Sequence, residues 1–87
     1  MNMFLERAAA LDLSSGPFKV LVKLATMVDE EGRFSSVHNP SLAIAQQCNL
    51  GQLVIENHLN SLIAKNFISI TSHTIDAAEV KTIQIQL

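Results

Sequence analysis

The sequence predicts an α+β fold in which two helices, joined by a tight turn, precede an antiparallel β-hairpin. Three observations support this prediction. Apolar residues recur every three or four positions through residues 15–28 and 39–66, which is the period of an amphipathic helix. Residues 67–87 contain runs of alternating apolar and polar side chains, as half-buried strands do. The length of 87 residues fits one domain with one modest core.

Residues 2–11 are expected to form a first helix, which Asn2 can cap. Phe4 and Ala8 lie one turn apart and begin an apolar side. Two interpretations of this accessory segment, residues 1–12, remain open. It either covers the core of its own chain or serves as a dimer arm that packs against a second subunit.

Residues 15–28 are the second expected helix, in which Ser15 can cap the start and Pro17 fits the first turn. Its apolar stripe is wide, which predicts a central helix that is buried on more than one side. Lys19 and Lys23 share its polar edge, where they are either solvated or in contact with phosphates. An acidic turn then leads to a short strand at residues 33–35.

Residues 39–66 are the segment around which the chain is organised, and they form a predicted helix-turn-helix. Asn39-Pro40 starts a short helix, because Asn caps well and Pro is tolerated at the first position. The corner at residues 49–51 contains Asn and Gly, which tolerate a left-handed backbone. A longer helix runs from about residue 52 to 65 and stops at Asn66. Its apolar residues are Ile55, Leu59, Leu62 and Ile63.

Two strands are expected after this unit, at residues 67–71 and 80–87, with a polar loop at residues 72–78. The short strand near Phe34 would complete a three-stranded sheet. The alternation continues to Leu87 without a polar tail, which favours a domain that belongs to a longer protein.

This order of elements is that of an α+β winged helix-turn-helix, mostly helical with a small antiparallel β-hairpin as its wing. We expect residues 1–87 to be a single winged-helix domain. Within it, residues 1–12 are the accessory helix, residues 39–66 the helix-turn-helix and residues 67–87 the wing hairpin.

Several motifs connect residues 15–68 with a known family. Residues 15–25 match its opening pattern S-x-x-x-x-V-L-x-x-L-A, and residues 29–36 match its link D-x-x-G-x-x-x-S. Pro40-Ser41 and Ile44-Ala45 stand where its second helix has P-S and L-A. The chain thus resembles the winged helix-turn-helix domains at the N-termini of replication initiators of phages, plasmids and phage satellites. The resemblance implies sequence-specific binding of double-stranded DNA, as the origin-binding domain of a mobile-element initiator.

The second helix of the pair departs from that family at its opening. It begins with Gly51-Gln52-Leu53-Val54-Ile55 and lacks the family's early arginine. The chain has a net charge of −2 and only six Lys and Arg residues with which to contact phosphates. We therefore expect a homodimer, since pairing doubles the few contacts that one subunit makes with DNA.

In a helix-turn-helix, the second helix enters the major groove and its early exposed side chains read base edges. Gln52, Asn57 and Asn60 are the predicted base-reading residues, because Gln and Asn can form paired hydrogen bonds with adenine. The alternative is that these amides form only a solvated polar face. Leu53 beside them either touches a thymine methyl or lies exposed.

Four residues are predicted to contact the DNA backbone. Ser41 lies at the N-terminus of the short helix, where free N–H groups attract an anion. Lys65 ends the recognition helix, and His73 and Lys81 belong to the wing. The alternative for each is ordinary solvated surface.

The sequence offers no support for an enzyme. The histidines are widely separated, no Cys or His pair has zinc spacing, and no Gly-rich phosphate loop occurs. We therefore expect no catalytic residue, metal, cofactor or small-molecule ligand. Cys48 is expected to be a small buried residue.

The sequence also bears on location. No apolar run reaches the roughly 18 residues of a membrane span, and the first residues do not form a secretory signal. A single cysteine excludes an internal disulfide and suits a reducing cytoplasm.

Two other functions remain open. One is a transcriptional regulator of the same fold, which differs from an initiator only in where its site lies. The other is a winged-helix protein-interaction or dimerisation module that does not bind DNA. The net charge of −2 and the missing arginine at the start of the recognition helix favour the interaction module.

Overall fold

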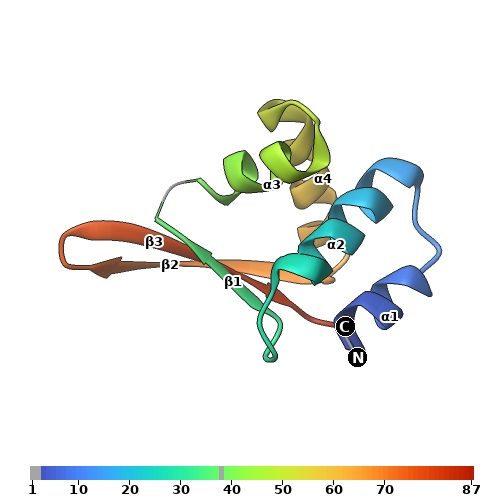
Figure 1. The fold of residues 1–87 in the computed structure, drawn as a ribbon, viewed down its shortest axis with the longest axis horizontal. Helices are drawn as coiled ribbons and strands as arrows, with labels where there is room; N and C mark the ends of the chain where they lie inside the picture. The colour runs from blue at the N-terminus through green and yellow to red at the C-terminus, as the bar shows by residue number, and fades with distance from the viewer. Residues whose placement is uncertain (1–2, 38) are drawn as a thin grey trace.

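The computed structural model describes residues 3–37 and 39–87, so Asn2 and the connector residue His38 lie outside the described part. The described residues form four helices and a three-stranded antiparallel sheet, which confirms the α+β prediction. Figure 1 shows the helices together on one side, with a long two-stranded ribbon projecting past them. The elements are α1 (Met3–Ala9), α2 (Ser15–Met27), β1 (Arg33–Ser36), α3 (Pro40–Cys48), α4 (Gln52–Ala64), β2 (Ile68–Ile75) and β3 (Ala78–Ile85).

The sheet has the strand order β1-β3-β2, with β3 in the centre. The register pairs Phe34 of β1 with Ile83 of β3, and Ile83 also pairs with Ile70 of β2. Because side chains alternate along a strand, these three apolar residues share the face toward the helices. The opposite face is polar, and there the hydroxyl groups of Ser35 and Thr82 form a hydrogen bond of 2.8 Å.

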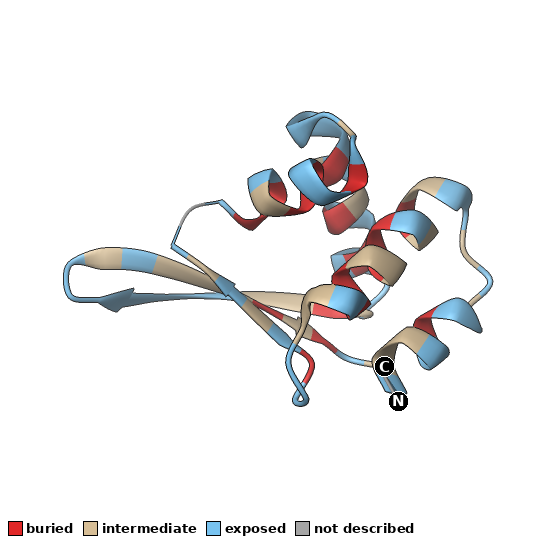
Figure 2. Ribbon diagram, in the orientation of Figure 1, coloured by how far each residue is buried: buried red, intermediate tan, exposed pale blue. Residues whose placement is uncertain are grey.

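The core lies between α2, α3, α4 and the sheet, as the buried residues in Figure 2 show. α2 packs against α1, α3 and α4, which confirms it as the central helix. Of the four apolar residues expected in this helix, Ile55, Leu59 and Leu62 are buried, and Ile63 is 37% exposed because it lies at the edge of the stripe. The fully buried side chains include Val20, Leu21, Leu24, Ile44, Ile55, Leu62 and Ile83.

Both turns of the helix pair have the expected backbone. Asn39 caps α3 and Pro40 is its first residue, and Asn49 ends it in the left-handed region with φ 56°. Asn66 follows α4 with φ 62°, also as expected. The start of α2 differs from the expectation: the capping position belongs to Ser14, one residue before Ser15, and its side chain makes no capping hydrogen bond.

The N-terminal helix packs against α2 of its own chain. Ala8 is fully buried and the Phe4 ring lies against Gly32. Arg7 Nη1 donates to the carbonyl oxygen of Leu87 at 2.7 Å, so α1 lies beside the last residues of the chain (Figure 1). Residues 3–9 therefore cover part of the core of their own chain. A dimer arm stays a prediction.

The wing is longer and its turn tighter than expected. Most of the predicted loop at residues 72–78 belongs to the strands, and only Asp76 and Ala77 form the turn. Their φ angles of 51° and 64° are both left-handed, as in a type I′ turn. The prediction was wrong because Asp-Ala is not a usual sequence for this turn. The last five residues of β2, before this turn, are all exposed, so they lack the alternation of buried and exposed side chains by which a strand is predicted.

Replacing Ala77 with Gly should stabilise the protein by about 1 kcal/mol, because an alanine in the left-handed region is strained. Thermal and urea denaturation followed by circular dichroism measure the change. Ala78→Gly is the matched control, because Ala78 lies in β3 and pairs with Ile75. It should destabilise by roughly 0.5–1 kcal/mol. A loss of stability in Ala77→Gly would contradict the observed turn.

Gly32→Ala should destabilise the protein by at least about 2 kcal/mol. Gly32 has φ 78°, and a Cβ there would lie 2.7 Å from Phe4 Cζ. Gly51→Ala is the control, since no atom lies within 4 Å of its Cβ position. Its effect should stay within about 0.5 kcal/mol, because a stiffer unfolded chain offsets a poorer helix cap. Equal unfolding midpoints for the two variants would count against the packing of α1.

Candidate nucleic-acid interface

The outward side of α4 carries a stripe of polar side chains. Leu53, Asn57 and Asn60 are exposed and Glu56 is half-buried, at the three- and four-residue spacing of one helix face. Ile55, Leu59 and Leu62 lie buried on the other side. The orientation predicted for this helix is therefore confirmed, and two amides stand on its solvent side.

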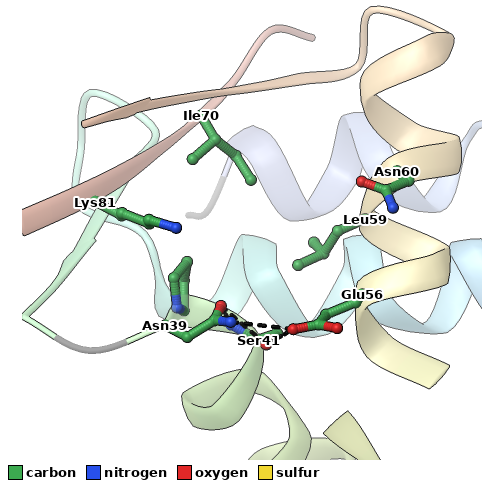
Figure 3. A pocket seen from close by; sticks show the side chains of 8 residues that line it. Asn39, Ser41, Glu56, Leu59, Asn60, Ile70 and Lys81 are labelled. Carbon is green, nitrogen blue, oxygen red and sulfur yellow. Dashed lines mark hydrogen bonds between the residues drawn. The ribbon is translucent and has the colours of Figure 1, made fainter. Parts of the chain in front are cut away.

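A hollow of about 240 Å³ lies between this stripe, the N-terminal end of α3 and the sheet. Asn60 comes from α4 and Lys81 from β3, and Figure 3 shows them on separate walls of the hollow. Ser41 lies at its base, beside Asn39 and Glu56. Three of the predicted DNA-contacting residues, Ser41, Asn60 and Lys81, are thus brought together here.

A hydrogen-bond network joins the start of α3 to α4 (Figure 3). Asn39 Oδ1 accepts from the backbone N–H of Ser41 at 3.1 Å and from its hydroxyl at 2.9 Å. Asn39 Nδ2 donates to Glu56 Oε1 at 3.0 Å. The Ser41 hydroxyl also lies 3.2 Å from Glu56 Oε1. The carboxylate of Glu56 therefore holds the cap of one helix against the side of the other.

This network argues against the role predicted for Ser41. Ser41 is 1% exposed, and its hydroxyl faces Asn39 and Glu56 rather than solvent. The N-terminus of a helix attracts an anion, and here the protein supplies one in the Glu56 carboxylate. A phosphate at this point would meet a negative charge, so we omit Ser41 from the interface.

The wing residues lie on opposite faces of the sheet. Lys81 faces the hollow, and its Nζ is 3.9 Å from Glu79 Oε1 in an exposed ion pair. His73 Nε2 lies 3.3 Å from Thr82 Oγ1 on the outer, polar face. A ligand that lies flat against α4 can therefore also contact Lys81, but it cannot reach His73 on the other face of the sheet.

The remaining predicted residues lie along α4. Gln52 is its first residue and is exposed, and Asn57, five residues later, is also exposed. Lys65 follows the last turn, roughly 20 Å along the axis from Gln52 at 1.5 Å per residue. Gln52 and Lys65 must therefore contact different parts of any ligand.

Sequence reasoning missed the structural role of Glu56. Asn39 is 17 residues away from it and Ser41 is 15 residues away, so no local pattern connects them. His58 is half-buried, with its ring against Gly16 of α2. Cys48 is buried as expected, at 4% exposure.

The described part of the chain offers neither a metal site nor a membrane-spanning helix. Within residues 3–37 and 39–87, no three His, Cys, Asp or Glu side chains are grouped to hold a metal ion. No helix among these residues has the length and apolar character needed to cross a membrane. Comparisons with protein-family models, curated proteins and solved structures found no match.

Glu56→Ala should cost about 1–2 kcal/mol of stability, because it leaves the buried Ser41 hydroxyl with one partner fewer. Asn39→Ala should cost about 1 kcal/mol by removing the cap. The double variant should lose less than the sum of the two, because both act in one network. Urea unfolding measures all three. Full additivity would show that Glu56 and Asn39 act separately.

Proposed function

We propose that this chain is a winged helix-turn-helix domain that binds double-stranded DNA at specific sequences. The observation that carries the proposal is the amide stripe of Asn57 and Asn60 on the outward face of α4, beside a wing that presents Lys81. The element order from α2 to β3 and the strand order β1-β3-β2 are those expected of a winged helix.

In this proposal α4 enters the major groove. A helix with its side chains is about 10–12 Å wide, which matches a groove about 12 Å wide. Asn57 and Asn60 then pair with adenine edges, Gln52 reads an adjacent base, and Leu53 contacts a thymine methyl. Lys65 and Lys81 are the proposed contacts to the DNA backbone, and His73 is left out because it lies on the opposite face of the wing from Lys81.

The charge of the interface favours two subunits. Lys81 is the only cation among the residues that line the hollow beside α4, and Glu79 neutralises part of its charge. Since phosphate contacts supply much of the affinity for DNA, one subunit binds weakly. We propose a homodimer on paired half-sites about one helical turn, roughly 34 Å, apart. The resemblance to replication initiators favours repeated sites in the DNA of a mobile element, and a transcriptional regulator would use the same contacts elsewhere.

A second candidate function is a protein-interaction module without DNA binding. The start of α4 is apolar, with Leu53 71% and Val54 43% exposed, and Glu56 lies beside them. Such side chains suit a protein surface as well as a thymine methyl. Dependence on salt separates the two functions, because DNA binding releases counterions and weakens steeply as salt rises.

The test begins with selection of bound duplexes from a random DNA pool, using the complete chain. On the selected duplex, Asn57→Ala and Asn60→Ala should each weaken binding by about 1–3 kcal/mol and relax the sequence preference. Gln86→Ala is the matched control, because it removes an amide on the outer face of the sheet, where Gln86 donates to Ser69. Fluorescence anisotropy over a salt series measures both affinity and slope.

Two outcomes would overturn the proposal. One is the absence of any selected duplex at low salt. The other is equal binding by the two asparagine variants and by the Gln86→Ala control. A binding constant that does not change with salt would favour the protein-interaction module instead.

A further inference from the structure

A groove of about 620 Å³ runs between α2 and the C-terminal end of α3. It shares no lining residue with the hollow beside α4, which uses the N-terminal end of α3. The groove is therefore a separate surface, and the proposed DNA contacts leave it uncovered.

The floor of the groove is apolar. Phe18 and Val22 lie one turn apart on α2, and both are partly buried against the core. Cys48, the last residue of α3, completes the floor with 4% exposure. Burial raises the pKa of the Cys48 thiol, so this side chain stays protonated and uncharged at neutral pH.

Two lysines stand beside this floor. Lys19 and Lys23 are one turn apart on α2, and both line the groove. Their positive charges partly oppose the effect of burial on the pKa of the Cys48 thiol. Among the described residues that line the groove there is no acid, and the ion pairs Arg33–Glu31 and Lys81–Glu79 involve neither lysine. Two charges without acidic partners therefore border an apolar surface in a chain of net charge −2.

We propose that this groove binds a short amphipathic helix with an acidic flank, supplied by a partner protein. The part of α2 from Phe18 to Thr26 is about 12 Å long, which accommodates roughly two turns of a partner helix. Apolar side chains one turn apart on the partner cover Phe18 and Val22, as in other helix-in-groove complexes. Two carboxylates, also one turn apart, meet Lys19 and Lys23.

The combination of surfaces favours a helix over nucleic acid. A phosphate backbone would use the two lysines but leave the apolar floor exposed to water. An amphipathic helix uses both, because it buries its apolar side and pairs its acids at the rim. The inference does not depend on DNA binding, since it uses none of the residues of the α4 face.

The probe is a fluorescein-labelled synthetic peptide of 14 residues, with Leu on one helix face and Glu on the flanks. The same peptide with Gln in place of Glu is the control for charge. A scrambled peptide of identical composition is the control for the apolar face. Fluorescence anisotropy with the complete chain should show binding of the acidic peptide in the micromolar range, about tenfold tighter than either control.

Variants of the chain locate the site. Lys19→Gln combined with Lys23→Gln should weaken peptide binding about fivefold, the sum of two exposed ion pairs. Lys65→Gln removes a lysine at the end of α4 and should have no effect. Val22→Glu should abolish binding by placing an acid on the floor, and circular dichroism checks that this variant folds. Bound peptide should also slow the reaction of Cys48 with a small thiol reagent, because it covers the floor.

Three results would overturn the proposal. The first is equal binding of the Glu and Gln peptides. The second is a lysine double variant that binds the acidic peptide normally. The third is displacement of the peptide by duplex DNA together with an equal loss of DNA affinity in the double variant, which would make the groove a DNA contact. Peptide binding that survives while duplex binding fails would uphold the groove and reject only the DNA proposal.

Discussion

The burial of α2 is the constraint on which the other elements depend. Val20, Leu21 and Leu24 are fully buried, and each such side chain stabilises the fold by about 1.5–3 kcal/mol. A 13-residue helix with so wide an apolar surface is stable only when other elements cover it. α1, α3 and α4 supply that cover. The packing of α4 against α2 in turn directs Asn57 and Asn60 toward solvent.

A second constraint acts at the start of α3, where Glu56 accepts hydrogen bonds from Asn39 and Ser41. A helix N-terminus in a DNA-binding domain commonly faces a phosphate, and here a carboxylate of the protein occupies that position. The same side chain that fixes the angle between the two helices therefore removes an anion site. In the proposed complex with DNA, the remaining contacts are the amides of α4 and the lysines Lys65 and Lys81, and amides suit base edges better than a run of phosphates.

Much of the fold follows from residues close together in the sequence. Asn39 caps a helix, Asn49 and Asn66 end helices in the left-handed region, and the stripe of α4 faces inward as its period requires. The wing did not follow in this way. Its turn places Ala77 at φ 64°, against the preference of the residue, because eight cross-strand pairs from Ile68 to Ile75 hold the ribbon together.

The sequence by itself determined the class of fold, the approximate limits of the helices and the outward direction of the amides. Those properties depend on neighbours within one or two turns. Tertiary structure alone decided that Ser41 is sealed by Glu56 and that Lys19 and Lys23 border an apolar groove. Each of these depends on contacts between elements that are distant in the chain, and only the packing of the whole core fixes such contacts.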